Sequence, residues 1–144
     1  MNYKNPHELD MYAFYWSEAK LVVAAAALFL GGVPPVYYLF PSWGGIVLAL
    51  KICWIVSGIA ALYLGYRWYS TGQSLFGHKD VRDKLTFFVL VISGVNLGLT
   101  GLLDKNIGMS IWSGQLIFII VGALYLFSAW HLLQRWNSHG KKLF

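Results

Sequence analysis

Charged side chains are scarce in this sequence: they make up 12% of its 144 residues, while hydrophobic residues make up 58%. Ordinary soluble domains carry about twice that share of charge, so the composition excludes that class. The single cysteine, Cys53, excludes an intrachain disulfide framework and a cysteine-rich metal site. The first ten residues contain acids and no apolar core, so we expect no cleavable signal peptide.

Acidic residues are especially few, six against eleven lysines and arginines, which gives a formal net charge of +5. In a soluble protein this excess would indicate nucleic-acid binding, but in an apolar chain it is explained by orientation in a membrane. We therefore expect the lipid bilayer as the surrounding medium and no nucleic-acid partner.

Long apolar stretches are present four times, and each is long enough to cross a bilayer as a helix of about twenty residues. They cover residues 21–40, 46–66, 85–103 and 111–133. The sequence therefore predicts an all-α integral membrane protein with four transmembrane helices, folded as a single membrane domain over residues 1–144.

The segment before the first span, residues 1–19, is polar to amphipathic. Leu9, Tyr12, Trp16 and Ala19 recur at steps of three and four residues, which is typical of one face of a helix. Two structures fit this pattern: an amphipathic helix lying at the membrane interface, and a helical extension of the first span.

The first span contains two consecutive prolines, Pro34 and Pro35. Each removes an amide donor and crowds the preceding turn, so we expect a helix break here. The pattern leaves open whether the helix kinks at the prolines or ends there.

Small residues form two stripes at helical spacing, which allow close packing between membrane helices. The predicted packing residues are Gly94, Gly98 and Gly101 in the third span and Ser57, Ala61 and Gly65 in the second. Because the third span also carries polar residues on its other side, we expect protein on both of its faces.

The distribution of positive charge predicts the topology. Four spans place nine basic residues on the side of both termini: Lys4, Lys20, Arg67, Lys79, Arg82, Lys84, Arg135, Lys141 and Lys142. The opposite side carries only Lys105, so both termini are expected in the cytoplasm. We expect a bacterial inner membrane, with an organelle membrane as the alternative.

An aromatic belt is predicted at the cytoplasmic boundary from Tyr12, Tyr15, Trp16, Tyr66, Trp68, Tyr69, Trp130 and Trp136.

An internal similarity appears when the chain is shifted by 62 residues, which aligns Ala61–Leu64 with Ala123–Leu126. It predicts two tandem hairpin repeats in parallel orientation, residues 20–70 and 82–132, joined by a cytoplasmic connection at residues 71–81. A cytoplasmic tail, expected to be mobile at its end, follows at residues 133–144. In this register Pro34 and Pro35 lie opposite Asn96 and Leu97.

The second repeat carries the pattern V-I-S-G-V-N-L-G-L-T-G-L-L at residues 91–103. Residues 85–133 resemble a family of small uncharacterised two-span bacterial membrane proteins with a G-x-N-W-G-L-x-G-L signature. Gly94, Asn96, Gly98 and Gly101 match that signature, and Leu97 replaces its tryptophan. The resemblance implies a helical hairpin and no activity.

A candidate polar track lies within the predicted membrane region and consists of Lys51, Asn96, Thr100, Gln115 and Asp104. These groups either line a solute path or join helices by hydrogen bonds, and Lys51 either has a function or extends its ammonium to the surface. If the hairpins pack closely, Lys51 is expected to approach Asp104.

No catalytic, cofactor-binding or metal-ligating group is predicted. His131 lacks a second histidine at matched depth for haem, and no nucleophile has a base at suitable spacing. We therefore expect no enzyme and no cofactor.

The leading hypothesis is a structural or accessory subunit that packs against itself or other membrane proteins, as a homo-oligomer or within a larger membrane complex. The alternative is a homo-oligomeric small-solute or ion transporter or channel with a polar mid-membrane track.

Overall fold

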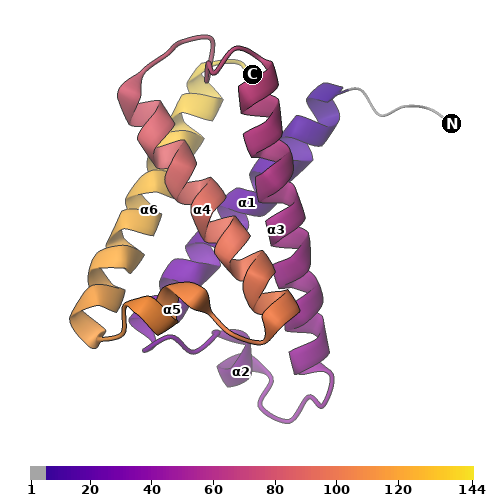
Figure 1. Ribbon diagram of the computed structural model, residues 1–144, viewed down its shortest axis with the longest axis vertical. Helices are drawn as coiled ribbons and strands as arrows, with labels where there is room; N and C mark the ends of the chain where they lie inside the picture. The colour runs from indigo at the N-terminus through magenta and orange to yellow at the C-terminus, as the bar shows by residue number, and fades with distance from the viewer. Residues whose placement is uncertain (1–5) are drawn as a thin grey trace, which may run out of the picture.

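The computed structural model describes residues 6–144, and the regular structure of this part of the chain is entirely helical (Figure 1). The elements in chain order are α1 (Pro6–Phe29), α2 (Val36–Leu39), α3 (Ile46–Ser70), α4 (Val81–Leu103), α5 (Ile107–Ile111) and α6 (Gln115–Ser138). Long helices thus alternate with single-turn helices in the order long, short, long, and this order occurs twice. The predicted all-α fold is confirmed.

Three helices of the described chain, α3, α4 and α6, are long and apolar enough to cross a membrane. They correspond to the stretches predicted at residues 46–66, 85–103 and 111–133. The last of these begins later than expected, at Gln115, because residues 107–111 form the separate helix α5. The stretch at residues 21–40 is not a single helix.

The break in that stretch lies at glycines rather than at the prolines. Gly31 and Gly32 have φ values of 75° and 88°, and the Gly32 amide donates to the Ala27 carbonyl at 2.8 Å. Glycine tolerates this left-handed conformation, which ends helices by satisfying their last carbonyls. The helix therefore ends before Pro34 and Pro35, which lie in the connection leading into α2.

The start of α1 shows which of the two structures expected before the first span is formed. The helix is continuous from Pro6 to Phe29, so within the described residues the amphipathic segment extends the following helix and does not form a separate interfacial one. At about 1.5 Å per residue, its 24 residues give a length of roughly 36 Å. Lys4 and the rest of residues 1–5 lie outside the described part.

The long helices form a bundle in which α3 packs along α4 and α1 along α6. The C-terminus and the α3–α4 connection lie at one end of this bundle, whereas α2 and α5 lie at the other (Figure 1). The core between the helices is apolar and aromatic. Its most buried large side chains are Phe14, Leu21, Leu64, Phe87, Leu90, Leu132 and Trp136.

Three groups that the sequence places at the surface are instead buried. Lys20, expected among the cytoplasmic charges, is 9% exposed within the bundle, and Trp136, expected in the aromatic belt, is fully buried. The predicted mobile tail continues α6 to Ser138 and then returns to the core, where Leu143 is 1% exposed. In each case the contacts come from helices distant in the sequence.

The chain contains one ten-residue pattern twice, R-W-x-S-x-G-x-x-L-F at residues 67–76 and 135–144. It covers the end of α3 and the end of α6, which therefore correspond at a shift of 68 residues. The 62-residue register does not match the helices, because it places Pro34, in a connection, opposite Asn96, inside α4.

Candidate functional site

The glycines of α4 lie against α3. A β-carbon added at Gly98 would lie 2.7 Å from the α-carbon of Gly58, and one at Gly94 would lie 2.5 Å from the β-carbon of Ala61. One at Gly101 would lie 2.9 Å from the Lys51 carbonyl oxygen. The small-residue stripes are thus used within the chain, and Gly58, which lies outside the predicted stripes, makes the closest backbone approach to α4.

The outer members of the predicted stripe behave differently. Ser57 is buried, accepts a hydrogen bond from the Trp16 indole at 3.0 Å and donates to the Cys53 carbonyl at 2.7 Å. Gly65 has more room, because a β-carbon there would lie 3.7 Å from the nearest atom, on Val91. Ser57 therefore joins α1 to α3, while Gly65 only borders the close contact.

The predicted approach of Lys51 to Asp104 is confirmed. Their Nζ and Oδ1 atoms lie 2.6 Å apart, and the side chains are 34% and 66% exposed. Asp104 directly follows α4 with a φ of 55°, and its amide donates to the Thr100 carbonyl. The ion pair therefore joins the start of α3 to the end of α4 at one end of the bundle.

The remaining polar residues of the predicted track are used locally. Asn96 donates through Nδ2 to Asn106 and accepts through Oδ1 from the Gly108 amide, both at 3.0 Å, which joins α4 to α5. Thr100 donates to the Asn96 carbonyl within its own helix, and Gln115 is exposed at the start of α6. These groups are brought into separate pairs rather than one continuous row.

A first buried ion pair joins the start of α1 to the end of α3. Arg67 donates to both oxygens of Asp10 through Nε and Nη2, at 2.8 and 2.7 Å, and Tyr63 donates to Asp10 at 2.8 Å. Asp10 is 6% exposed. Bidentate geometry and a third donor compensate the cost of removing this carboxylate from water.

A second ion pair of the same form joins the start of α4 to the end of α6. Arg135 donates to both oxygens of Asp83 at 2.8 to 3.0 Å, and Nε2 of His131 lies 2.8 Å from Asp83. Asp83 is 1% exposed. His131 occupies the position that Tyr63 has in the first ion pair, and its Nε2 contacts the Asp83 carboxylate.

The residues next to these arginines pack across the two halves of the chain. Phe14 stacks on Trp136 with ring centroids 4.5 Å apart, and Phe87 lies 6.3 Å from Trp68. Each half therefore places the phenylalanine of its first long helix against the tryptophan that ends the second long helix of the other half.

Lys20 contacts α4 from inside the bundle. Its ammonium donates to the Leu90 carbonyl at 3.1 Å and to the Ser93 hydroxyl at 2.7 Å. Both acceptors are uncharged, so among the described residues this ammonium is held by a carbonyl and a hydroxyl dipole and makes no direct ion pair.

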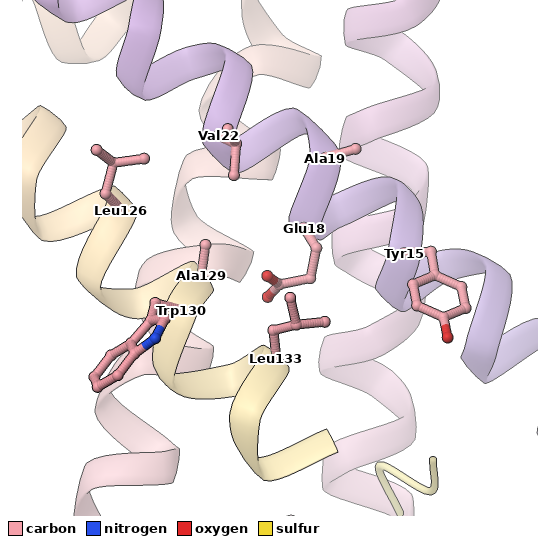
Figure 2. A pocket seen from close by; sticks show the side chains of 8 residues that line it. All are labelled: Tyr15, Glu18, Ala19, Val22, Leu126, Ala129, Trp130 and Leu133. Carbon is pink, nitrogen blue, oxygen red and sulfur yellow. The ribbon is translucent and has the colours of Figure 1, made fainter. Parts of the chain in front are cut away.

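An open groove of about 560 Å³ runs between α1 and α6 (Figure 2). Its walls are apolar and aromatic except for one carboxyl, that of Glu18, which points toward α6. Glu18 is 7% exposed, and its Oε1 has no hydrogen-bond partner among residues 6–144. The lining residues are Tyr15, Glu18, Ala19 and Val22 of α1 and Leu126, Ala129, Trp130 and Leu133 of α6.

Neither buried ion pair was predicted from the sequence, nor was the burial of Lys20 and Glu18. A usable signal existed for the arginines, since both begin the repeated R-W-x-S-x-G-x-x-L-F pattern. For Glu18 and Lys20 the signal was charge inside a predicted helical run. In residues 6–144 no group of three histidine, cysteine or acidic side chains is arranged to hold a metal ion.

This fold, with three apolar helices long enough to cross a bilayer and charged groups inside the bundle, defines a helical membrane protein. No protein-family model matches the chain, and neither a curated protein nor a solved structure matches it. The resemblance of residues 85–133 to the two-span bacterial family stays a prediction.

Proposed function

We propose that this protein is a structural or accessory subunit of a membrane assembly, with no reaction of its own. The observation that carries the proposal is the distribution of polarity. Apart from Glu18, the buried charged side chains Asp10, Lys20 and Asp83 are paired or hydrogen-bonded inside the bundle, whereas its outer surface exposes large apolar side chains on every long helix. Such a molecule is shaped to lie among lipids and other membrane helices.

In this proposal α1 is the fourth membrane helix. Apart from Glu8, which is exposed near its start, its charged residues Asp10, Glu18 and Lys20 are at least nine-tenths buried, while Val22 and Val23 are 46% and 57% exposed. Because these charged side chains are buried, the exposed residues of α1 are more apolar than its composition as a whole. The ion pair from Asp10 to Arg67 supports placing the start of α1 at the same end as the end of α3.

The two halves are proposed to be tandem repeats, in the register of the R-W-x-S-x-G-x-x-L-F pattern. In that register Tyr63 corresponds to His131, whereas Asp10 and Asp83 make equivalent contacts at a shift of 73 residues, so the spacing between the two long helices differs by five residues between the halves. Each carboxylate is bound by the arginine of its own half, and a shared ancestry would explain why the two halves make the same contacts.

The transporter alternative receives less support. It needs a connected polar path, whereas Asn96, Thr100 and Lys51 are used in separate local contacts and the core is filled by leucine and aromatic side chains. An aqueous track is therefore not the feature that this bundle presents.

The test is purification of the full chain from its native membrane in mild detergent, followed by native mass measurement. We expect a defined homo-oligomer or a complex with larger membrane subunits. A monomer that conducts solute across liposomes would contradict the proposal.

The topology is tested separately in a Cys53→Ser background. A thiol introduced as Ser138→Cys is expected to react with a membrane-impermeant reagent only from the cytoplasmic side, and one introduced as Ser110→Cys only from the opposite side. Labelling of both from one side would contradict a membrane-crossing α6.

A further inference from the structure

We propose that the groove between α1 and α6 binds a lipophilic organic cation, whose positive charge pairs with the Glu18 carboxylate. This inference goes beyond the proposed assembly role and does not depend on it. It rests on three features of the groove: an unsatisfied acid, an apolar wall and two aromatic side chains at the rim (Figure 2).

The acid has Lys20 as an electrostatic neighbour, but its buried oxygen has no hydrogen-bond partner among residues 6–144. Oε1 of Glu18 is buried and accepts no hydrogen bond from the described residues. The nearest cation in sequence, Lys20, has its ammonium committed to Leu90 and Ser93 of α4. Ionising a buried carboxyl group without a hydrogen-bond partner is costly, and a cation that enters the groove offsets this cost.

The rest of the lining selects the kind of cation. Apart from Glu18, the groove offers hydrocarbon and ring surface, so a small hydrated metal ion would lose its water and gain only one ligand. An organic cation compensates for its lost hydration, because it buries its own apolar groups against the groove wall. A volume of about 560 Å³ lies in the range of small-molecule pockets.

The rim supplies further recognition of positive charge. Tyr15 and Trp130 line the groove and are 39% and 58% exposed. Aromatic faces attract organic cations, most strongly when the site is shielded from water. Val22, Leu126 and Leu133 are also partly exposed, so the groove opens toward the lipid-facing side of α1 and α6, from which a lipophilic ligand arrives.

The test measures binding of tetraphenylphosphonium to the full chain in lipid nanodiscs by equilibrium dialysis. We expect saturable binding to the wild type, and Glu18→Gln is expected to lower the affinity by roughly thirtyfold or more, because it removes one member of a desolvated charge pair. The matched control is Glu8→Gln, an exposed acid of the same helix, which is expected to leave the affinity unchanged. Uncharged triphenylphosphine oxide is expected to bind without any effect of Glu18→Gln.

A second variant keeps the acid and removes the space. Ala19 is exposed on the groove wall, so Ala19→Leu fills the groove without entering the core and is expected to abolish saturable binding. It provides the test if Glu18→Gln fails to fold, as judged by circular dichroism. Absence of saturable binding to the wild type, or equal affinity in Glu18→Gln, would overturn the inference. So would a dimer that covers the groove, is broken by Ala19→Leu and leaves tetraphenylphosphonium unbound.

Discussion

The guanidinium of Arg67 lies over the ring of Phe144, 5.7 Å from its centroid. The reverse contact is also present, since Arg135 lies over Phe76 at the same distance. Each pair joins the first residue of one R-W-x-S-x-G-x-x-L-F segment to the last residue of the other, and the Phe76 amide donates to the Leu143 carbonyl at 2.8 Å. The two segments therefore lock the halves of the chain together at one end of the bundle.

The leucines of these segments are expected to contribute equally to this lock. Leu75 and Leu143 are 2% and 1% exposed, so Leu75→Ala and Leu143→Ala should each lower the free energy of unfolding by about 2–5 kcal/mol. Leu124→Ala, on the exposed side of α6, should change it much less. The measurement is a denaturant titration in detergent followed by circular dichroism. A loss confined to one of the two buried sites would argue against equivalent segments.

The contact between α3 and α4 predicts opposite effects for two glycine substitutions. Gly98→Ala places a methyl group against the Gly58 backbone, and this overpacking should cost about 1–3 kcal/mol. Gly65→Ala has 3.7 Å to its nearest neighbour and should be neutral or stabilising by up to about 1 kcal/mol, because alanine favours the helix. Thermal unfolding in detergent compares them. Equal midpoints would show that the helices do not approach this closely.

Asp83, inside α4, and Asp104, which directly follows this helix, are expected to contribute differently to the free energy of unfolding. Asp83→Asn removes the buried carboxylate that Arg135 and His131 contact. This substitution should lower the free energy of unfolding by about 3–5 kcal/mol. Asp104→Asn breaks a largely exposed pair and should cost under about 1 kcal/mol. Asparagine also tolerates the left-handed backbone of residue 104, which makes this variant a fair control. The readout is the denaturant midpoint, and a larger effect at Asp104 would contradict the assignment.

Asn96 is expected to hold α5 rather than the whole bundle. Asn96→Ala removes its hydrogen bonds to Asn106 and Gly108, which should cost about 1 kcal/mol and speed amide exchange in residues 107–111. Hydrogen exchange with mass spectrometry measures this, with the exposed Gln115→Ala as the control. Unchanged exchange in α5 would show that the asparagine has another role.

Much of the framework follows from the sequence, because long apolar runs have few alternatives in a bilayer. The start of α3 and the end of α4 agree with prediction, and the charge pair Lys51–Asp104 followed from placing one lysine and one acid at the same end. The Asp80 carboxyl before α4 accepts the Arg82 amide, which lowers the pKa of this exposed acid and marks where the helix begins.

The interior was less predictable, because its partners are distant in sequence. Glu18 and Lys20 interrupt the hydropathy of α1, so they were expected before the first span, whereas the helix buries them against α6 and α4. The alignment that suggested a 62-residue shift matched alanine and leucine, which are common everywhere in this chain. The rarer pairing of arginine with tryptophan carried the correct correspondence of the helix ends.

The crossed pairing of the two helix-end segments has a consequence for biosynthesis. Arg67 and Leu75 leave the ribosome long before Phe144, so α1 and α3 are synthesised before the ring and the carbonyl that complete their contacts at this end of the bundle. Final closure must then occur after residues 135–144 are synthesised. A nascent chain stalled before that point would expose an unsealed bundle to the proteases that survey newly inserted membrane proteins.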